Sequence, residues 1–97
     1  MTIVWSAQAR DDLKAIQAFI ARDSDLYALR VVETIVSRVE EISSMPTRGH
    51  PVHEHPKASL REIHSGNYRI IYDYGDEVLS VVTILHMRQK LPRKRLG

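Results

Sequence analysis

The sequence contains no cysteine among its 97 residues, and glycine and proline occur only four times each. Without thiols, disulfide-stapled scaffolds, thiolate metal sites and cysteine nucleophiles are excluded. No apolar run approaches the ~18 residues of a membrane span, and the N-terminus lacks the charged start and apolar core of a signal peptide. We therefore expect one cytoplasmic domain over residues 1–97 that makes no contact with a membrane.

A strong net charge is also missing, because the formal balance is only +2. The charge is unevenly placed, however. Residues 1–47 carry a balance of −2 and residues 48–97 a balance of +4, and the C-terminal tail at about 89–97 contains no acid. Such a basic tail is compatible with a phosphate backbone or an acidic protein partner, and equally with a solvated end of the chain.

The first half of the sequence predicts one strand and two helices. Residues 2–5 are mostly β-branched or aromatic, as in a strand, and Ser6 is a good N-cap for a following helix. Apolar side chains recur at helical spacing through residues 7–21, and again from residue 25 until Pro46. Because the break between the two helices is short, we expect an antiparallel helical hairpin that covers a sheet.

The second half predicts three strands at about residues 58–64, 67–74 and 77–86, separated by Ser65-Gly66-Asn67 and Tyr74-Gly75-Asp76. The last strand is apolar at both sets of alternating positions, so we expect it to be central and covered on both faces. The predicted fold class is α+β: an N-terminal strand, an antiparallel helical hairpin and a three-stranded antiparallel meander (β-α-α-β-β-β). The helices would cover one face of the sheet and leave the other free for a partner.

Arg69 is the most conspicuous charge within these strands. It lies between apolar neighbours, and burying its charge without a partner would be costly. Its guanidinium therefore either faces outward, where it can bind phosphate or a partner, or pairs internally with Glu62, Asp73 or another acid. Arg61 and Glu62 likewise either take part in binding or form ion pairs across strands at the sheet surface.

The loop that follows Pro46 holds several potential metal donors. They are His50, His53 and His55, with Glu54 and His64 as further candidates. Their spacing fits no closed zinc motif, and the prolines of this loop already account for a rigid polar segment. We therefore expect no metal and no cofactor. His86 is either a structural histidine or an acid–base group.

Five short segments form an ordered set along nearly the whole chain. They are the start W-S-A-Q-A-R-D-D-L-K-A-I-Q-A-F-I, the loop residues Pro46 and Gly49, Leu60-Arg61-Glu62, Tyr68-Arg69-Ile70-Ile71-Tyr72 and Ile84-Leu85-His86-Met87-Arg88. This set resembles the RelE/ParE superfamily of toxins from bacterial type II toxin–antitoxin systems. The resemblance implies the fold described above and a toxin that arrests growth. It also implies a cognate antitoxin, ParD-like, that wraps the toxin in a hetero-oligomer and binds operator DNA on behalf of the complex.

The ParE-like branch of this superfamily poisons DNA gyrase and has no catalytic residues. The Leu60-Arg61-Glu62 triplet, the His86-Met87-Arg88 ending and the basic tail look more like this branch, and we adopt it as the first hypothesis. Six basic residues are then the candidates for binding the target or the antitoxin: Arg61, Arg69, Arg88, Arg93, Lys94 and Arg95.

The RelE-like branch, a ribosome-dependent and metal-independent mRNA endonuclease, is the alternative. By motif position, Arg69 and Arg88 would stabilise the phosphate charge and His86 would act as acid or base. The sequence departs from this pattern, because Leu60 and Glu62 stand where such enzymes often carry lysines and the tail has no tyrosine. A second alternative is a degenerate module that only binds an antitoxin.

Overall fold

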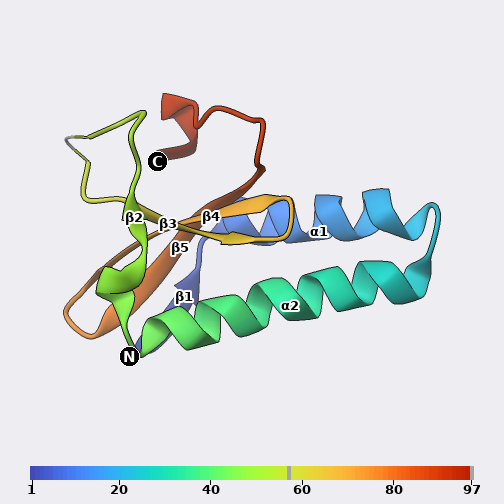
Figure 1. Cartoon of the computed structure of the whole chain (residues 1–97), viewed down its shortest axis with the longest axis horizontal. Helices are drawn as coiled ribbons and strands as arrows, with labels where there is room; N and C mark the ends of the chain where they lie inside the picture. The colour runs from blue at the N-terminus through green and yellow to red at the C-terminus, as the bar shows by residue number, and fades with distance from the viewer. Residues whose placement is uncertain (57, 97) are drawn as a thin grey trace.

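The computed structural model describes residues 1–56 and 58–96. Its elements are β1 (Thr2–Trp5), α1 (Ala7–Ala21), α2 (Asp25–Ser43), the 3-10 turn η1 (Pro46–Arg48), β2 (His50–Pro51), β3 (Arg61–Ser65), β4 (Tyr68–Gly75), β5 (Val78–His86) and the 3-10 turn η2 (Arg93–Leu96). Figure 1 shows the helical hairpin lying along the sheet. None of the helices in the described ranges is long and apolar enough to cross a membrane.

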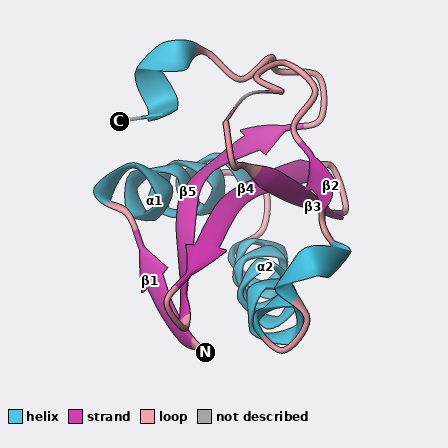
Figure 2. Cartoon of the chain, turned by 90° about the vertical axis from the view of Figure 1, so that its left-hand side faces the viewer, coloured by secondary structure: helices cyan, strands magenta, loops and turns pink. Residues whose placement is uncertain are grey.

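The strands form one five-stranded sheet in the order β1-β5-β4-β3-β2, in which only the β1–β5 pair is parallel (Figure 2). The predicted strand, helical hairpin and three-stranded meander are confirmed. The short strand β2 was not predicted, because two residues ending in a proline carry no periodic signal.

Both helices begin at the serines that the capping rules favour. The Ser6 hydroxyl accepts a hydrogen bond from the Ala9 amide at 3.0 Å, and the Ser24 hydroxyl accepts one from the Tyr27 amide at 3.1 Å. Each cap satisfies an amide that has no partner within the helix. Local sequence therefore sets the residue at which each helix begins.

The main core lies between the helical hairpin and the sheet. Its fully buried side chains come from both layers: Ala9, Ile35, Val39, Ile70, Tyr72, Leu79 and Val81. Apolar surface removed from water in this way contributes about 25 cal/mol per Å², so this layer contact supplies the main stabilisation of the fold.

A second, smaller core covers the opposite face of the sheet, so the expectation that this face is free was wrong. Ile71 and Leu85 of the sheet pack there against Val52, Leu60 and Leu91. The loop after β2 and the C-terminal tail thus form a cover of their own. The prediction that β5 is central and covered on both faces is confirmed.

A β-bulge at Val82 changes which face of the sheet the side chains at the end of β5 point to. Ile71 pairs with Thr83 and Tyr72 with Val81, which leaves Val82 as an extra residue. Val81 and Ile84 consequently join the same core, although strict alternation would place them on opposite faces. The sequence pattern alone did not reveal this shift.

Polar side chains of α1 and its N-cap complete the edge of β5 at the bulge. The Ser6 hydroxyl donates to the Val82 carbonyl at 2.7 Å, and the Asp12 carboxylate accepts from the Thr83 hydroxyl at 2.5 Å and the Ile84 amide at 2.9 Å. β1 pairs with β5 only as far as Val81, so these side chains replace a missing strand partner. Asp12 is only 8% exposed, unlike its neighbour Asp11 on the open side of the helix.

We predict that Asp12→Ala lowers the free energy of unfolding by about 2–4 kcal/mol, because a buried amide and a hydroxyl lose their acceptor. The matched control is Asp11→Ala, which removes an exposed carboxylate one residue away and should change stability by less than about 0.5 kcal/mol. Urea unfolding followed by circular dichroism measures both. Equal stability of the two variants would contradict this account of the bulge.

Candidate functional site

Arg69 lies in the centre of a closed ion-pair network on the sheet face opposite the helices. Its Nε and Nη2 donate to the two carboxylate oxygens of Glu62 at 3.0 and 2.8 Å. Its Nη2 and Nη1 donate to the oxygens of Glu54 at 2.6 and 3.1 Å. The residue is 5% exposed. The internal pair, one of the two readings of Arg69 from the sequence, is therefore the one present.

The same network joins the loop and the tail to the sheet. Arg69 Nη1 also donates to the Gln89 carbonyl at 2.8 Å, and the Leu91 amide donates to Glu54 at 2.6 Å. The imidazole of His64 lies 2.8 Å from Glu62. Segments that are distant in sequence thus meet at one guanidinium, which holds the cover over the second core.

The network shifts the acid–base equilibria of its members. The hydrogen bonds from Arg69 are the largest influence on Glu54 and lower the pKa of its carboxyl from 4.5 to about 2. Burial raises the pKa of Glu62, but the hydrogen bonds from Arg69 and His64 outweigh it, so the pKa is lowered overall. The pKa of Arg69 is raised, chiefly by its hydrogen bonds to Glu62 and then Glu54. All three groups are therefore charged near neutral pH.

Two more of the predicted binding residues have partners within the chain. Arg61 Nη1 donates to the Gly49 carbonyl at 2.7 Å. Arg95 Nη1 donates to Asp12 at 2.8 Å and to the Thr83 hydroxyl at 3.0 Å, so the tail is docked on β5. Arg61 and Arg95 hold loops in place, as Arg69 does.

Gly49 is required where the loop passes over Tyr72. Its amide donates to the Tyr72 hydroxyl at 3.0 Å, and that hydroxyl donates to the Pro46 carbonyl at 2.7 Å. A Cβ at Gly49 would lie 2.1 Å from the hydroxyl oxygen, so any other residue would displace the ring. The Pro46 and Gly49 signature of the sequence is thus explained by packing against a buried tyrosine.

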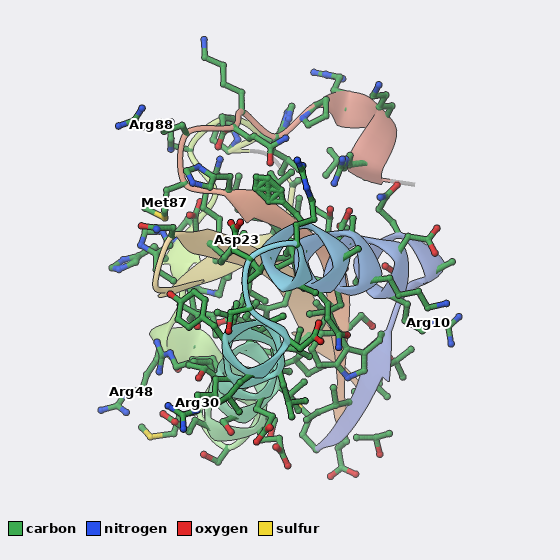
Figure 3. The ribbon with its side chains drawn as sticks, turned by 90° about the vertical axis from the view of Figure 1, so that its right-hand side faces the viewer. Arg10, Asp23, Arg30, Arg48, Met87 and Arg88 are labelled. Atoms are coloured by element: carbon green, nitrogen blue, oxygen red, sulfur yellow. The ribbon has the colours of Figure 1, made fainter. Side chains whose placement is uncertain are left out.

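The other predicted binding residues lie in the turn after β5 and on η2. The Met87 amide donates to the Asn67 carbonyl at 2.7 Å, and the Arg88 amide donates to His86 Nδ1 at 3.2 Å. These bonds fix the turn, while the Met87 and Arg88 side chains project outward (Figure 3). Arg93 and Lys94 are also exposed on η2. Among the described residues, no acid forms an ion pair with Arg88.

An open groove of about 410 Å³ runs between α2 and the β3–β4 turn. It is lined by Ile20, Tyr27, Arg30, Val31, Thr34 and residues 65–68. Large exposed apolar side chains surround the tip of the helical hairpin nearby: Phe19, Leu26, Tyr27 and Leu29. Sequence analysis missed this apolar surface, although its signal was present as apolar residues outside the core-facing stripe of each helix.

The comparisons with known proteins agree with this architecture. The model of a family described as "ParE toxin of type II toxin-antitoxin system, parDE" matches residues 3–91. The chain belongs to the ParE toxin family. This membership confirms the superfamily resemblance found in the sequence. No curated protein matches the chain.

Two solved structures share the fold of this ParE-family chain. The chromosomal ParDE toxin–antitoxin system of P. aeruginosa superposes with a TM-score of 0.76 at 19% identity, over 89% of this chain and 95% of the other. The toxin–antitoxin complex RelBE2 of Mycobacterium tuberculosis superposes with a TM-score of 0.67 at 21% identity, over 88% of each chain. At these identities, the likeness concerns the fold.

The three residues proposed for RelE-like chemistry occupy unlike environments. Arg69 is buried and paired with the carboxylates of Glu54 and Glu62, whereas Arg88 is exposed. His86 is also exposed, and its Nδ1 accepts a hydrogen bond from the Arg88 amide. The His86 ring also meets Tyr68 edge-on, with centroids 5.9 Å apart. Within the described part of the chain, no three His, Asp or Glu side chains gather closely enough to hold a metal ion.

The pKa of Glu54 makes stability dependent on pH. Because its folded-state pKa lies below its ordinary value, the stabilisation is present above about pH 4.5 and is lost as the pH falls toward 2. We predict that Glu54→Gln lowers the free energy of unfolding by about 2 kcal/mol at pH 7, and that this difference shrinks below pH 4.5. Denaturant unfolding between pH 7 and pH 2.5 measures it, with the exposed Glu40→Gln as control. A constant difference across this range would contradict the assignment.

Proposed function

We propose that the chain is the toxin of a ParDE-like pair, that it inhibits DNA gyrase by binding it, and that a cognate antitoxin neutralises it in the cytoplasm. Membership of the ParE family supports the proposal. The observation that carries it is the state of Arg69, whose guanidinium is fully engaged by Glu54, Glu62 and a backbone carbonyl.

Metal-free cleavage of RNA by a ribose 2′-hydroxyl needs cations around the reacting phosphate and a group that moves protons. For Arg69 to serve as such a cation, it would have to leave two carboxylates. Breaking a buried pair of this kind costs about 3–5 kcal/mol. His86, the proposed acid or base, has one ring nitrogen held by the turn. These features favour an inhibitor that acts by binding over an mRNA endonuclease.

Of the six basic residues predicted to bind a target, Arg88, Arg93 and Lys94 are exposed and would make that contact. The antitoxin would occupy the groove beside α2, where Tyr27 and Val31 offer apolar contacts and Arg30 a cation. An amphipathic acidic segment matches this combination. In this proposal, operator DNA is bound only through the antitoxin.

The proposal predicts that the purified chain inhibits supercoiling by gyrase and traps gyrase on cleaved plasmid DNA, which is released as linear DNA after protease treatment. It also predicts intact mRNA when the chain is added to translating ribosomes. In induced cells, chromosome breakage should precede any loss of bulk mRNA. Codon-phased mRNA cleavage with unaffected gyrase would overturn the proposal and favour the endonuclease.

A pair of arginine variants locates the surface. We predict that Arg88→Ala weakens gyrase inhibition about tenfold while the free energy of unfolding changes by less than about 0.5 kcal/mol. The control is Arg10→Ala, since Arg10 is exposed on the opposite side of the molecule (Figure 3) and should leave inhibition unchanged. Arg69→Ala is unsuitable for this purpose, because it would leave two buried carboxylates unpaired and destabilise the fold. Full inhibition by Arg88→Ala would exclude this turn from the binding surface.

A further inference from the structure

Charges of opposite sign are separated along β5. The strand begins at Val78, directly after the turn that carries the exposed acids Asp76 and Glu77. No acid occurs from Val78 to the C-terminus. The tail after His86 carries five basic residues instead: Arg88, Lys90, Arg93, Lys94 and Arg95. The nine residues of β5 span about 27 Å, and Figure 1 shows the β4–β5 turn and the tail at opposite ends of the sheet. One end of the sheet is therefore acidic and the other basic.

Four of these five cations are available to a ligand. Arg95 donates to the Asp12 carboxylate at 2.8 Å, which neutralises its charge. The other four are exposed, and none of them forms an ion pair with an acid of the described residues. We call these four residues the basic end: Arg88, Lys90, Arg93 and Lys94. The turn that holds Arg88 and the C-terminal 3-10 turn stand at the same end of the molecule (Figure 3).

The Arg69 network fixes the backbone that carries the basic end. Arg69 Nη1 donates to the Gln89 carbonyl at 2.8 Å, and the Leu91 amide donates to Glu54 at 2.6 Å. Lys90 lies between these two anchored residues and is exposed, while the Leu91 side chain is buried in the second core. The Glu54 carboxylate is engaged by Arg69 and by the Leu91 amide. The basic end is therefore preformed, and the acid beside it is already paired.

The composition of the basic end matches a phosphate backbone better than a protein surface. The cores of protein–protein interfaces are enriched in aromatic residues and depleted of lysine, whereas protein–DNA interfaces are polar and positively charged. Two of the four cations are lysines, and Met87 is the one large exposed apolar side chain in residues 86–96. Exposed aromatic side chains lie instead at the tip of the helical hairpin, at Phe19 and Tyr27.

We propose that the basic end binds the sugar–phosphate backbone of double-stranded DNA. Each of its four cations neutralises one phosphate, and contacts to the backbone carry no sequence information. Recognition of the operator is thus left to the antitoxin. That this DNA is the segment held by gyrase rests on the proposed function. In that setting the basic end gives the chain a higher affinity for gyrase with bound DNA than for gyrase alone.

The salt dependence of DNA binding tests the proposal without gyrase. When a protein neutralises Z phosphates of duplex DNA, the logarithm of the association constant falls with the logarithm of the salt concentration with a slope of about −0.9Z. Four cations therefore predict a slope of about −3.6, so that affinity falls about 150-fold between 50 and 200 mM salt. Fluorescence anisotropy of a short labelled duplex, titrated with the full chain at several NaCl concentrations, measures the slope. A duplex of unrelated sequence should bind equally well.

Two double variants with the same change in charge locate the contact. Arg88→Gln/Lys94→Gln removes two cations of the basic end and should reduce the slope to about −1.8. Arg10→Gln/Lys14→Gln removes two exposed cations of α1. These lie about 200° around the helix from Asp12, and so away from the docked tail. This control should leave the slope at about −3.6. Circular dichroism checks that both variants fold.

Three results would overturn the proposal. The first is no binding of duplex DNA even at the lowest salt concentration, and the second is equal slopes for the two double variants. The third identifies an acidic protein surface as the ligand: Arg88→Gln/Lys94→Gln weakens binding to gyrase without DNA, while its slope on duplex DNA equals that of the unsubstituted chain.

The DNA titration and the gyrase assay fail separately. Inhibition of gyrase by a chain that does not bind duplex DNA would reject the DNA contact and leave the proposed function standing. Binding of duplex DNA with the predicted slopes, but without inhibition of gyrase, would reject the proposed function and support the basic end as a DNA-binding surface.

Discussion

The pairing of one buried arginine with two carboxylates is the interaction on which the second half of this structure depends. Removing three charges from water is expensive, and it is tolerated only when the hydrogen-bonding capacity of each group is met. Here both oxygens of Glu54 and Glu62 accept from Arg69, and the Leu91 amide and the His64 ring complete the shell. Because these partners come from the loop, the tail and two strands, the network fixes the course of segments without regular structure.

The six basic residues predicted to bind a target or the antitoxin fall into two groups. Arg61, Arg69 and Arg95 donate to carbonyls or carboxylates of their own chain and hold its segments together. Arg88, Arg93 and Lys94 remain exposed. The basic surface expected from the sequence is therefore smaller than a count of arginines suggests.

The sequence predicted the elements well because their signals are local. Capping by Ser6 and the helical spacing of apolar residues are features of neighbouring positions, and they placed both helices correctly. The features it missed depend on distant partners. Glu54 lies in a loop with no periodicity, so nothing local marked it as the second acid for Arg69. The Val82 bulge lies beside Asp12, whose carboxylate accepts from the Ile84 amide, yet in the sequence Asp12 reads as an ordinary acid near a helix start.

The identity of residue 62 links this packing to the chemistry of the superfamily. RelE-like enzymes often carry lysine near this place, and a second cation beside Arg69 would repel it and hold its guanidinium open toward a phosphate. A glutamate has the opposite effect, since it attracts the same arginine into the sheet and neutralises it. With Glu54 present as well, the local charge is negative rather than positive, which disfavours a phosphate. In this chain the guanidinium of Arg69 is therefore held within the sheet by two carboxylates.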